Sequence, residues 1–285
     1  IFNEFKPRAI INFAAETHVD KSISSPEHFI STNILGVFNL LEASREYWSN
    51  LPEHERQSFR FFHISTDEVY GDLKTDEPSF NEKNPYSPNS PYSASKASAD
   101  HLVRAWNKTY GLPTLISKCS NNYGPYQYPE KLIPLCIINA LQHKPIPIYG
   151  DGLQIRDWLY VEDHCTAIRK ILDKGISGET YNIGGNNEKT NIQIVNKICE
   201  ILDELKPSYK KDSYKKLITH TKDRPGHDRR YSVNSSKIEK ELGWIPHENF
   251  ESGIRKTIEW YLENTDWLKE LMSEEYCNWL ESHYK

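Results

Sequence analysis

A tyrosine and a lysine stand four residues apart in the segment Tyr92-Ser-Ala-Ser-Lys96. If this segment opens a helix, both side chains lie on one face of it. A tyrosine with an ordinary pKa of about 10 is a poor base at neutral pH. A neighbouring ammonium group stabilises the phenolate and lowers that pKa, which favours proton transfer. The spacing alone is weak evidence, because Tyr70 and Lys74 share it across a Gly-Asp pair that favours a loop.

Two adjacent acids, Asp67 and Glu68, follow the apolar run from Phe59 to Ser65. Such a run predicts a buried strand, and ligands of open α/β sheets bind at the carboxyl ends of the strands. The two acids can be ordinary loop residues. Alternatively, they supply a general acid and a general base, which a dehydration requires at the two carbons concerned.

The elements that must position these residues alternate along the first two-thirds of the chain. Apolar runs predict strands at 9–15, 59–65 and 114–119, and apolar spacing predicts helices at 33–47 and from 92 to about 109. This order indicates an α/β fold with a doubly wound parallel sheet of the Rossmann type. We expect that domain over residues 1–122. Residues 123–285, with helices at 191–205 and 264–283, form mainly a smaller substrate lobe, interleaved with the last strands of the sheet.

The composition excludes several classes of protein. A net charge of −5 and a pI of about 6.2 provide no basic surface for nucleic acid. No apolar run reaches the roughly 20 residues of a membrane span, and the first residues do not form a signal peptide. Five scattered cysteines without a C-x-x-C pair indicate reduced thiols of a cytoplasmic protein. The histidines lack the spacing of ligands, so we expect no metal site.

Six segments of the chain occur in a recognisable order: Asn12 to Asp20, Ser65 to Gly71, Tyr92 to Lys96, Ser120 to Pro125, Gln154 to Trp158, and Asp223 to Asp228. Together they resemble the nucleotide-sugar 4,6-dehydratases that act on dTDP-glucose, which are extended short-chain dehydrogenases/reductases. The resemblance implies NAD as cofactor, a small-molecule nucleotide sugar as partner, and a place in deoxysugar biosynthesis such as the rhamnose pathway.

The resemblance also implies a mechanism. Tyr92, assisted by Lys96, removes the proton from the sugar O4 while C4 passes hydride to NAD⁺, and Thr66 hydrogen-bonds O4. Glu68 abstracts the C5 proton, and Asp67 protonates the C6 hydroxyl so that it leaves as water. Hydride returns to C6, which leaves a 4-keto-6-deoxy sugar. The Asp67–Glu68 pair separates this family from the epimerases and decarboxylases of the superfamily, which need no acid at C6.

The remaining motif residues are implied to bind ligands. The residues implied to bind the cofactor are Phe13, Ala14, Ala15, Glu16, Thr17, Thr32 and Asn122, together with Tyr92 and Lys96. Thr17 and Thr66 are implied to lie at the sugar, and Asn121 is implied to contact the substrate. Those at the nucleoside are Lys131, Leu132, Pro147, Ile148 and Tyr149, and those at the diphosphate are Arg156, Asn191, Arg224 and His227. Arginine suits the diphosphate because its planar group pairs with phosphate oxygens bidentately.

The chain departs from the family at its start. It has no Gly-rich turn to hold the pyrophosphate at a helix N-terminus, so we expect the encoded protein to be longer by at least two β-α units. Three alternatives remain open: a 4,6-dehydratase of a UDP, GDP or CDP sugar, a nucleotide-sugar 4-epimerase, and a non-catalytic nucleotide-sugar or NAD(H)-sensing module. The resemblance further implies a homodimer formed by the helices at 33–47 and 92–109.

Overall fold

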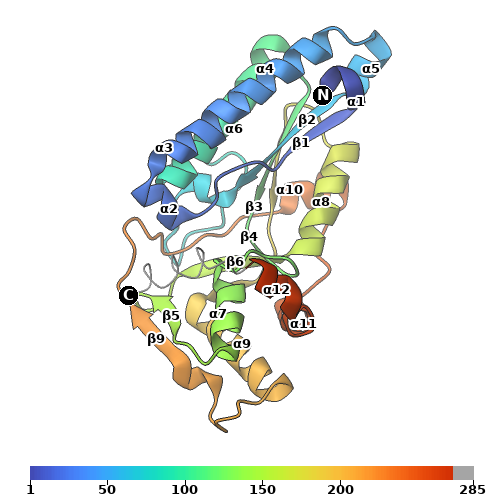
Figure 1. Ribbon diagram of the computed structural model, residues 1–285. Helices are drawn as coiled ribbons and strands as arrows, with labels where there is room; N and C mark the ends of the chain where they lie inside the picture. Colours follow the sequence, from blue (N-terminus) through green and yellow to red (C-terminus); the bar gives the residue numbers. More distant parts are fainter. Residues whose placement is uncertain (272–285) are drawn as a thin grey trace. The chain divides into compact units, whose positions relative to one another are not determined.

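A computed structural model of the chain describes residues 1–271, which divide between two compact units (Figure 1). Unit 1 comprises Ile1–Ser120, His164–Gly184 and Arg230–Ile245, and unit 2 comprises Asn121–Asp163, Gly185–Arg229 and the segment from Pro246. The chain thus leaves unit 1 after its third strand and returns to it twice.

Unit 1 is built on a four-stranded parallel sheet in the order β1-β2-β3-β7. The strands are β1 (Ala9–Asn12), β2 (Arg60–Thr66), β3 (Thr114–Cys119) and β7 (Thr180–Ile183). Nearly every residue of β2 and β3 is buried, as their continuous apolar runs predict for strands covered on both faces. The predicted α/β fold with a parallel sheet is confirmed.

Helices cover both faces of this sheet (Figure 1). On one face, α4 (Gly36–Ser49) and α6 (Pro91–Tyr110) enclose a core in which Leu41 and Val103 pack with Phe61 and Ile116 of the strands. The other face carries α8 (Val161–Lys174) and α10 (Ser236–Leu242). The shorter helices of unit 1 are α1 (Phe2–Phe5), α2 (Val19–Ser24), α3 (Pro26–Phe29) and α5 (Glu53–Ser58).

The start of α6 is fixed by its own sequence. The hydroxyl of Ser90 accepts a hydrogen bond from the Ser93 amide, and the Ser93 hydroxyl accepts one from the Ser90 amide, which forms a capping box. Pro91 occupies the first turn, where its missing N–H is harmless. Gly111 ends the helix with a φ of 75°. The position of the first helical turn, which carries Tyr92, is therefore fixed by these local contacts.

Two predicted elements of unit 1 differ from the structure. The strand predicted at 9–15 ends at Asn12, because the Asn12 side chain accepts a hydrogen bond from the Ala14 amide at 3.2 Å and the chain turns away. The helix predicted at 33–47 begins earlier, as the π-helix η1 (Ile30–Leu35), and continues into α4.

Unit 2 contains a three-stranded sheet in the order β4-β6-β8 and a two-stranded sheet of β5 and β9. Its elements are β4 (Asn121–Tyr123), α7 (Leu132–Leu141), β5 (Ile146–Tyr149), β6 (Ile155–Tyr160), β8 (Glu188–Thr190), α9 (Asn191–Leu205), η3 (Tyr214–Leu217), β9 (Ile218–Thr221), α11 (Phe250–Glu263) and α12 (Thr265–Leu271). The helix predicted at 191–205 matches α9. Of the helix predicted at 264–283, the part after residue 271 lies outside the described residues. No helix within residues 1–271 is long and apolar enough to cross a membrane.

Candidate active site

The predicted acid–base residues lie in unit 1 at the carboxyl end of β2. Thr66 ends the strand and caps the 3₁₀ helix η2 (Asp67–Tyr70), because its hydroxyl oxygen accepts a hydrogen bond from the Glu68 amide at 3.3 Å. The Thr66 hydroxyl also donates to Asp67 Oδ1 at 3.3 Å, and Asp67 is buried. Gly71 ends this turn with a φ of 89°, and a Cβ there would lie 2.2 Å from the Ser87 carbonyl oxygen. These contacts hold the two carboxyl groups in one hydrogen-bonded turn.

Tyr92 and Lys96 lie on the buried face of α6, one helical turn apart. Tyr92 has a side-chain hydrogen bond with Thr66, which joins the head of α6 to the end of β2. Its ring also meets that of Phe29 edge-on, with 6.4 Å between centroids. Lys96 Nζ donates to the Ile64 carbonyl oxygen at 2.8 Å. The structure therefore brings together the catalytic residues that the sequence predicted.

The electrostatics of Tyr92 oppose its ionisation. Burial raises the pKa of Tyr92 well above its ordinary value, and Glu68, Cys119 and Asp67 raise it further, whereas the hydrogen bond with Thr66 lowers it. This direction is opposite to the one expected from the Tyr-x-x-x-Lys spacing, because spacing reveals neither burial nor the nearby carboxyl groups. Burial likewise lowers the pKa of Lys96, and Asp100, one turn further along α6, raises it.

The loop after β1 holds the predicted cofactor residues. Phe13, Ala14, Glu16 and Thr17 are exposed, Ala15 is half-buried, and Thr32 is exposed on η1. Phe13 is 59% exposed at the carboxyl end of a parallel strand, which is where dinucleotides bind in this architecture. An exposed aromatic ring and exposed polar residues fit a flat, polar cofactor such as NAD.

Two buried asparagines that the sequence analysis did not single out hold this loop. Asn33 in η1 accepts from the Glu16 amide at 2.8 Å, donates to the Glu16 carbonyl oxygen at 3.0 Å, and donates to Ser95 Oγ on α6 at 2.9 Å. Asn12 holds the Ala14 amide from the other side. A polar residue on the apolar face of a predicted helix is a signal that could have identified Asn33.

The second group of predicted residues lies in unit 2, around Tyr149 at the end of β5. The Arg224 guanidinium lies 6.0 Å from the centroid of the Tyr149 ring, and the His227 ring meets that ring edge-on at 6.1 Å. His227 Nδ1 lies 2.6 Å from Asp223 Oδ1. Burial, reinforced by Arg224, lowers the pKa of His227 to about 4. At neutral pH the histidine is therefore an uncharged ring beside an arginine.

Arg156 lies in β6 close to the same group, since its charge also lowers the pKa of His227. It is buried, and its guanidinium donates to the carbonyl oxygens of Ile155 at 2.8 Å and Asp228 at 3.0 Å. Asp223 and Gln154, which were not predicted as site residues, support the arrangement, because Gln154 Nε2 donates to Asp223 Oδ2 at 3.1 Å. The result is a positively charged, aromatic corner suited to a nucleotide diphosphate.

The other predicted substrate residues of unit 2 lie at the ends of its elements. Asn121 and Asn122 begin β4, Lys131 and Leu132 lie at the start of α7, Pro147 and Ile148 are in β5, and Asn191 begins α9. The side-chain oxygens of Asn121 and Asn191 are buried and have no hydrogen-bond partner among residues 1–271. Buried amide oxygens are normally paired, so these two atoms fit contacts with a ligand.

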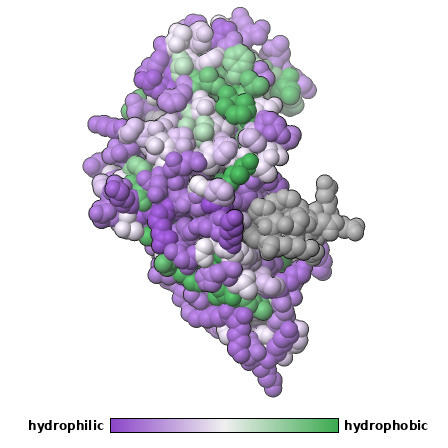
Figure 2. Space-filling model, turned by 90° about the vertical axis from the view of Figure 1, so that its left-hand side faces the viewer, coloured by the Kyte–Doolittle hydropathy of each residue, from purple (hydrophilic) through white to green (hydrophobic). Residues whose placement is uncertain are grey.

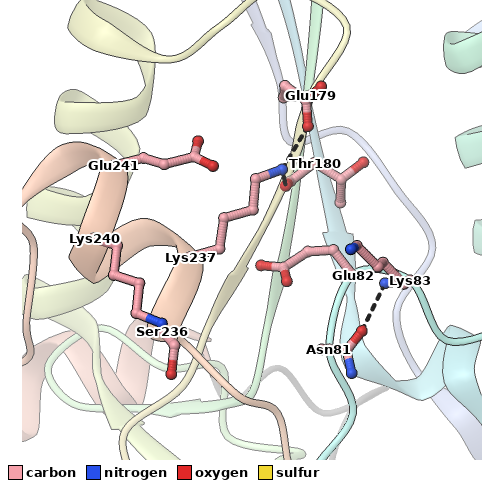
Figure 3. A pocket seen from close by; sticks show the side chains of 9 residues that line it. All are labelled: Asn81, Glu82, Lys83, Glu179, Thr180, Ser236, Lys237, Lys240 and Glu241. Carbon is pink, nitrogen blue, oxygen red and sulfur yellow. Dashed lines mark hydrogen bonds and ion pairs between the residues drawn. The ribbon is translucent and has the colours of Figure 1, made fainter.

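A cavity of about 650 Å³ in unit 1 contains none of the predicted site residues (Figure 3). Lysines and glutamates dominate it, and the Lys237 ammonium donates to Glu179 Oε2 at 2.6 Å and to the Thr180 carbonyl oxygen at 2.7 Å. Its lining consists of Asn81, Glu82, Lys83, Glu179, Thr180, Ser236, Lys237, Lys240 and Glu241. The catalytic residues are therefore assigned elsewhere in unit 1, since none of them lines this cavity. In the part of the chain from 1 to 271, no cluster of three His, Cys, Asp or Glu residues is placed to hold a metal ion.

A parallel α/β sheet with a Tyr-x-x-x-Lys helix beside the end of a central strand defines a Rossmann-type dehydrogenase/reductase. The pattern of the GDP-mannose 4,6 dehydratase family matches residues 1–257. The dTDP-glucose 4,6-dehydratase of Salmonella typhimurium is 58% identical to this chain in sequence. The match covers 100% of this chain and 81% of the Salmonella protein. The chain belongs to this family of nucleotide-sugar 4,6-dehydratases.

Solved structures agree with that assignment. The dTDP-glucose 4,6-dehydratase of Bacillus anthracis, in complex with NAD, is 47% identical with a TM-score of 0.81, covering 95% of this chain and 77% of that one. The UDP-glucose 4-epimerase of Thermus thermophilus, also in complex with NAD, is 28% identical with a TM-score of 0.80, covering 92% and 80% of the two chains. The fold is thus shared with epimerases, but the identity is higher with the dehydratase.

Proposed function

We infer that this chain catalyses the NAD-dependent conversion of dTDP-glucose to dTDP-4-keto-6-deoxyglucose and water. One observation carries the reaction type: the Asp67–Glu68 turn after β2 is joined through Thr66 to Tyr92 at the head of α6. A dehydration across C5 and C6 needs an acid and a base in addition to the group that acts at O4, and this turn supplies both. The relatives with the same named activity support the choice of dTDP-glucose.

The residues of unit 1 divide the proton transfers among them. Tyr92 takes the O4 proton, with Thr66 hydrogen-bonded to the same oxygen and Lys96 supplying positive charge from the next turn. Glu68 removes the C5 proton, which the C4 ketone has made acidic. Asp67, buried and hydrogen-bonded to Thr66, protonates the C6 hydroxyl so that it leaves as water. Bound NAD supplies a hydride acceptor for C4 and a hydride donor for C6.

The cofactor is assigned to the loop after β1 and to η1, with Phe13, Ala14, Ala15, Glu16, Thr17 and Thr32 as its contacts, and to Asn122 in unit 2. The nucleotide is assigned to unit 2. Tyr149 with Pro147, Ile148, Lys131 and Leu132 holds the pyrimidine, and Arg156, Arg224, His227 and Asn191 hold the diphosphate. Asn121 and Thr17 contact the sugar. The exposed Phe13 ring and the unpaired oxygens of Asn121 and Asn191 support these assignments.

We also propose a homodimer through η1, α4 and α6. Leu35 is 54% exposed, Phe38 is 40% exposed and Tyr110, at the end of α6, is 48% exposed. Figure 2 shows hydrophobic residues on the upper part of the visible face, where α4 and α6 run in Figure 1. Exposed apolar side chains gathered on neighbouring helices are typical of an interface. A cytoplasmic location is supported by the scattered cysteines, none of them spaced as C-x-x-C, which are typical of reduced thiols. Cys277 lies outside the described residues.

The test of this function is a product analysis with dTDP-, UDP-, GDP- and CDP-glucose and added NAD⁺. We expect a 4-keto product that has lost one water, formed fastest from dTDP-glucose, by mass and NMR analysis. Equal rates with UDP-glucose would contradict the assigned nucleotide. A C4 epimer of unchanged mass, or binding without any product, would contradict the reaction itself.

A further inference from the structure

A buried polar cluster lies beneath Tyr92, on the side of Lys96 away from the head of the helix. Tyr92, Lys96 and Asp100 follow one another at four-residue intervals along the inner face of α6, and all three are buried. Asp100 is 1% exposed. A carboxylate in such a place requires partners, because burial without them strongly disfavours its charge.

Asp100 interacts with the segment before α6 and with residues of β2 and β3. Tyr86, in the segment before α6, donates from its hydroxyl to Asp100 Oδ2 at 3.1 Å. His63 of β2 places Nε2 at 3.6 Å from Asp100 Oδ1. Burial raises the pKa of Asp100, and the ammonium groups of Lys118 on β3 and Lys96 on the same helix oppose that rise by stabilising the carboxylate. Asp100 is thus the acid shared by two buried lysines.

The orientation of His63 follows from its other neighbour. Asn12 Oδ1 accepts from the Ala14 amide, so the Asn12 amide nitrogen is the group that faces His63 Nδ1 at 3.2 Å. Nitrogen of an amide only donates, so Nδ1 accepts and the ring proton lies on Nε2, toward Asp100. Burial holds the pKa of His63 well below its usual value, which keeps the ring neutral. Asn12 therefore orients His63 so that its Nε2–H faces the Asp100 carboxyl group, 3.6 Å away.

Lys118 is also held by neighbouring side chains. Its ammonium donates to the Tyr70 hydroxyl at 2.9 Å and lies 4.3 Å from the ring centroids of both Tyr70 and Tyr86. Burial lowers the pKa of Lys118 to about 8, and Asp100 is the first group that raises it. The Tyr70 hydroxyl in turn donates to Asn182 at 2.9 Å, and the Asn182 amide donates to Glu82 on the wall of the cavity in Figure 3.

We propose that Asp100 is a positioning residue for Lys96. The buried Asp100 carboxylate accepts a hydrogen bond from Tyr86 and is faced by His63, and it keeps the Lys96 ammonium charged and directed to the Ile64 carbonyl oxygen, one helical turn from Tyr92. This inference rests on the proposed roles of Tyr92 and Lys96. Within residues 1–271, the hydrogen bond that Lys96 donates goes to a neutral carbonyl oxygen, and Asp100 is the first of the charged groups that oppose the effect of burial on Lys96. Other titratable or charged groups also affect the pKa values in this cluster. Cys119 acts on Lys96, Glu82 and Lys237 act on Lys118, and Arg104 acts on Tyr86.

The proposal predicts how the rate depends on pH. Without the carboxylate, Lys96 loses its proton at a lower pH, because burial then acts on it with no opposing anion. In Asp100→Asn, the alkaline limb of the kcat–pH profile should move down by about one pH unit or more, with KM for dTDP-glucose little changed. Asp100→Glu should restore the limb at least in part. Tyr86→Phe keeps the carboxylate but removes one of its hydrogen bonds, so its limb should shift in the same direction by a smaller amount.

Asp157→Asn is the matched control, because Asp157 is another buried carboxyl group, 1% exposed, bonded to the Gly185 and Asn187 amides in unit 2. It should leave the position of the alkaline limb unchanged even if it lowers the thermal midpoint. If Asp100→Asn folds and its alkaline limb lies at the same pH as in the parent protein, the proposal is wrong. If Asp100→Asn does not fold, an unchanged alkaline limb in Tyr86→Phe would overturn the proposal instead. Lys96→Met distinguishes a failure of the inference about Asp100 from a failure of the proposed function. If Lys96→Met keeps normal activity, the role assigned to Lys96 is wrong. If Lys96→Met is inactive but the alkaline limb of Asp100→Asn does not move, only the inference about Asp100 is wrong.

Discussion

At the scale of single residues, the arrangement separates the first hydride transfer from the loss of water. In the proposed mechanism, Tyr92 acts before the C4 ketone exists, whereas Asp67 and Glu68 act only after it has formed. Asp67→Asn and Glu68→Gln should therefore oxidise C4 and then stop, with NADH accumulating on the enzyme and turnover reduced by about 10²-fold or more. Tyr92→Phe should form no NADH. The measurement is the near-ultraviolet absorbance of NADH in a single turnover.

The control for these variants is Tyr209→Phe, since Tyr209 is a tyrosine of unit 2 that is 75% exposed. It should match the parent chain in both absorbance and turnover. Normal turnover by either Asp67→Asn or Glu68→Gln would show that the acid–base roles are assigned to the wrong residues.

His227 offers a prediction about nucleotide binding. Its pKa is depressed to about 4, so the ring gains a proton only when the pH falls through that value and contributes no charge at neutral pH. We expect His227→Gln to bind dTDP more weakly, by a ratio that stays constant between about pH 8 and about pH 5.5. Calorimetry of dTDP binding to the parent chain and to His227→Gln at several pH values measures that ratio. Protonation of dTDP itself affects both affinities equally and so cancels in the ratio. A ratio that widens as the pH falls through about 6.5 would mean that His227 binds as an imidazolium.

At the scale of elements, the turn that carries the two acids depends on Gly71. An alanine there would place its Cβ 2.2 Å from a backbone carbonyl oxygen. Gly243 also has a positive φ, of 64°, but a Cβ would meet nothing within 4 Å. Gly71→Ala should therefore lower the free energy of unfolding by about 1–3 kcal/mol more than Gly243→Ala, and should also reduce turnover. Denaturant titration of the two variants tests this, and equal losses would contradict the close approach at Gly71.

Several elements that carry site residues match the ranges that the sequence predicted. Strand β3 matches its predicted range, β2 differs by one residue at each end, and α9 matches as well, because apolar period and capping residues are local signals. Helix α7 was missed because it is apolar on all sides and shows no period, and α8 and α11 were not predicted either. The buried cluster around Asp100 could not be predicted, since His63 and Asn12 come from other strands and meet it only through the fold.

At the scale of the whole molecule, the sequence predicted the family and which motif residues to consider, but not the electrostatics of Tyr92. The proposed homodimer is testable at this scale. Phe38→Glu combined with Leu35→Glu places charges on exposed apolar positions of η1 and α4, and should convert the dimer to monomer because burying unpaired charges is costly. Ile176→Glu, at a position in unit 1 that is 58% exposed and outside these helices, is the control. Sedimentation velocity distinguishes the species, and an unchanged dimer in the double variant would place the interface elsewhere.

The central claim is that one site oxidises C4, eliminates water across C5 and C6, and returns the same hydride to C6. The most direct measurement uses dTDP-glucose that carries deuterium at C4, incubated with the protein and NAD⁺, with the position of the label in the product read by NMR. We predict a 4-keto-6-deoxy sugar with the deuterium in its C6 methyl group. Deuterium retained at C4 in a sugar that has lost no water would contradict the dehydration and indicate an epimerase.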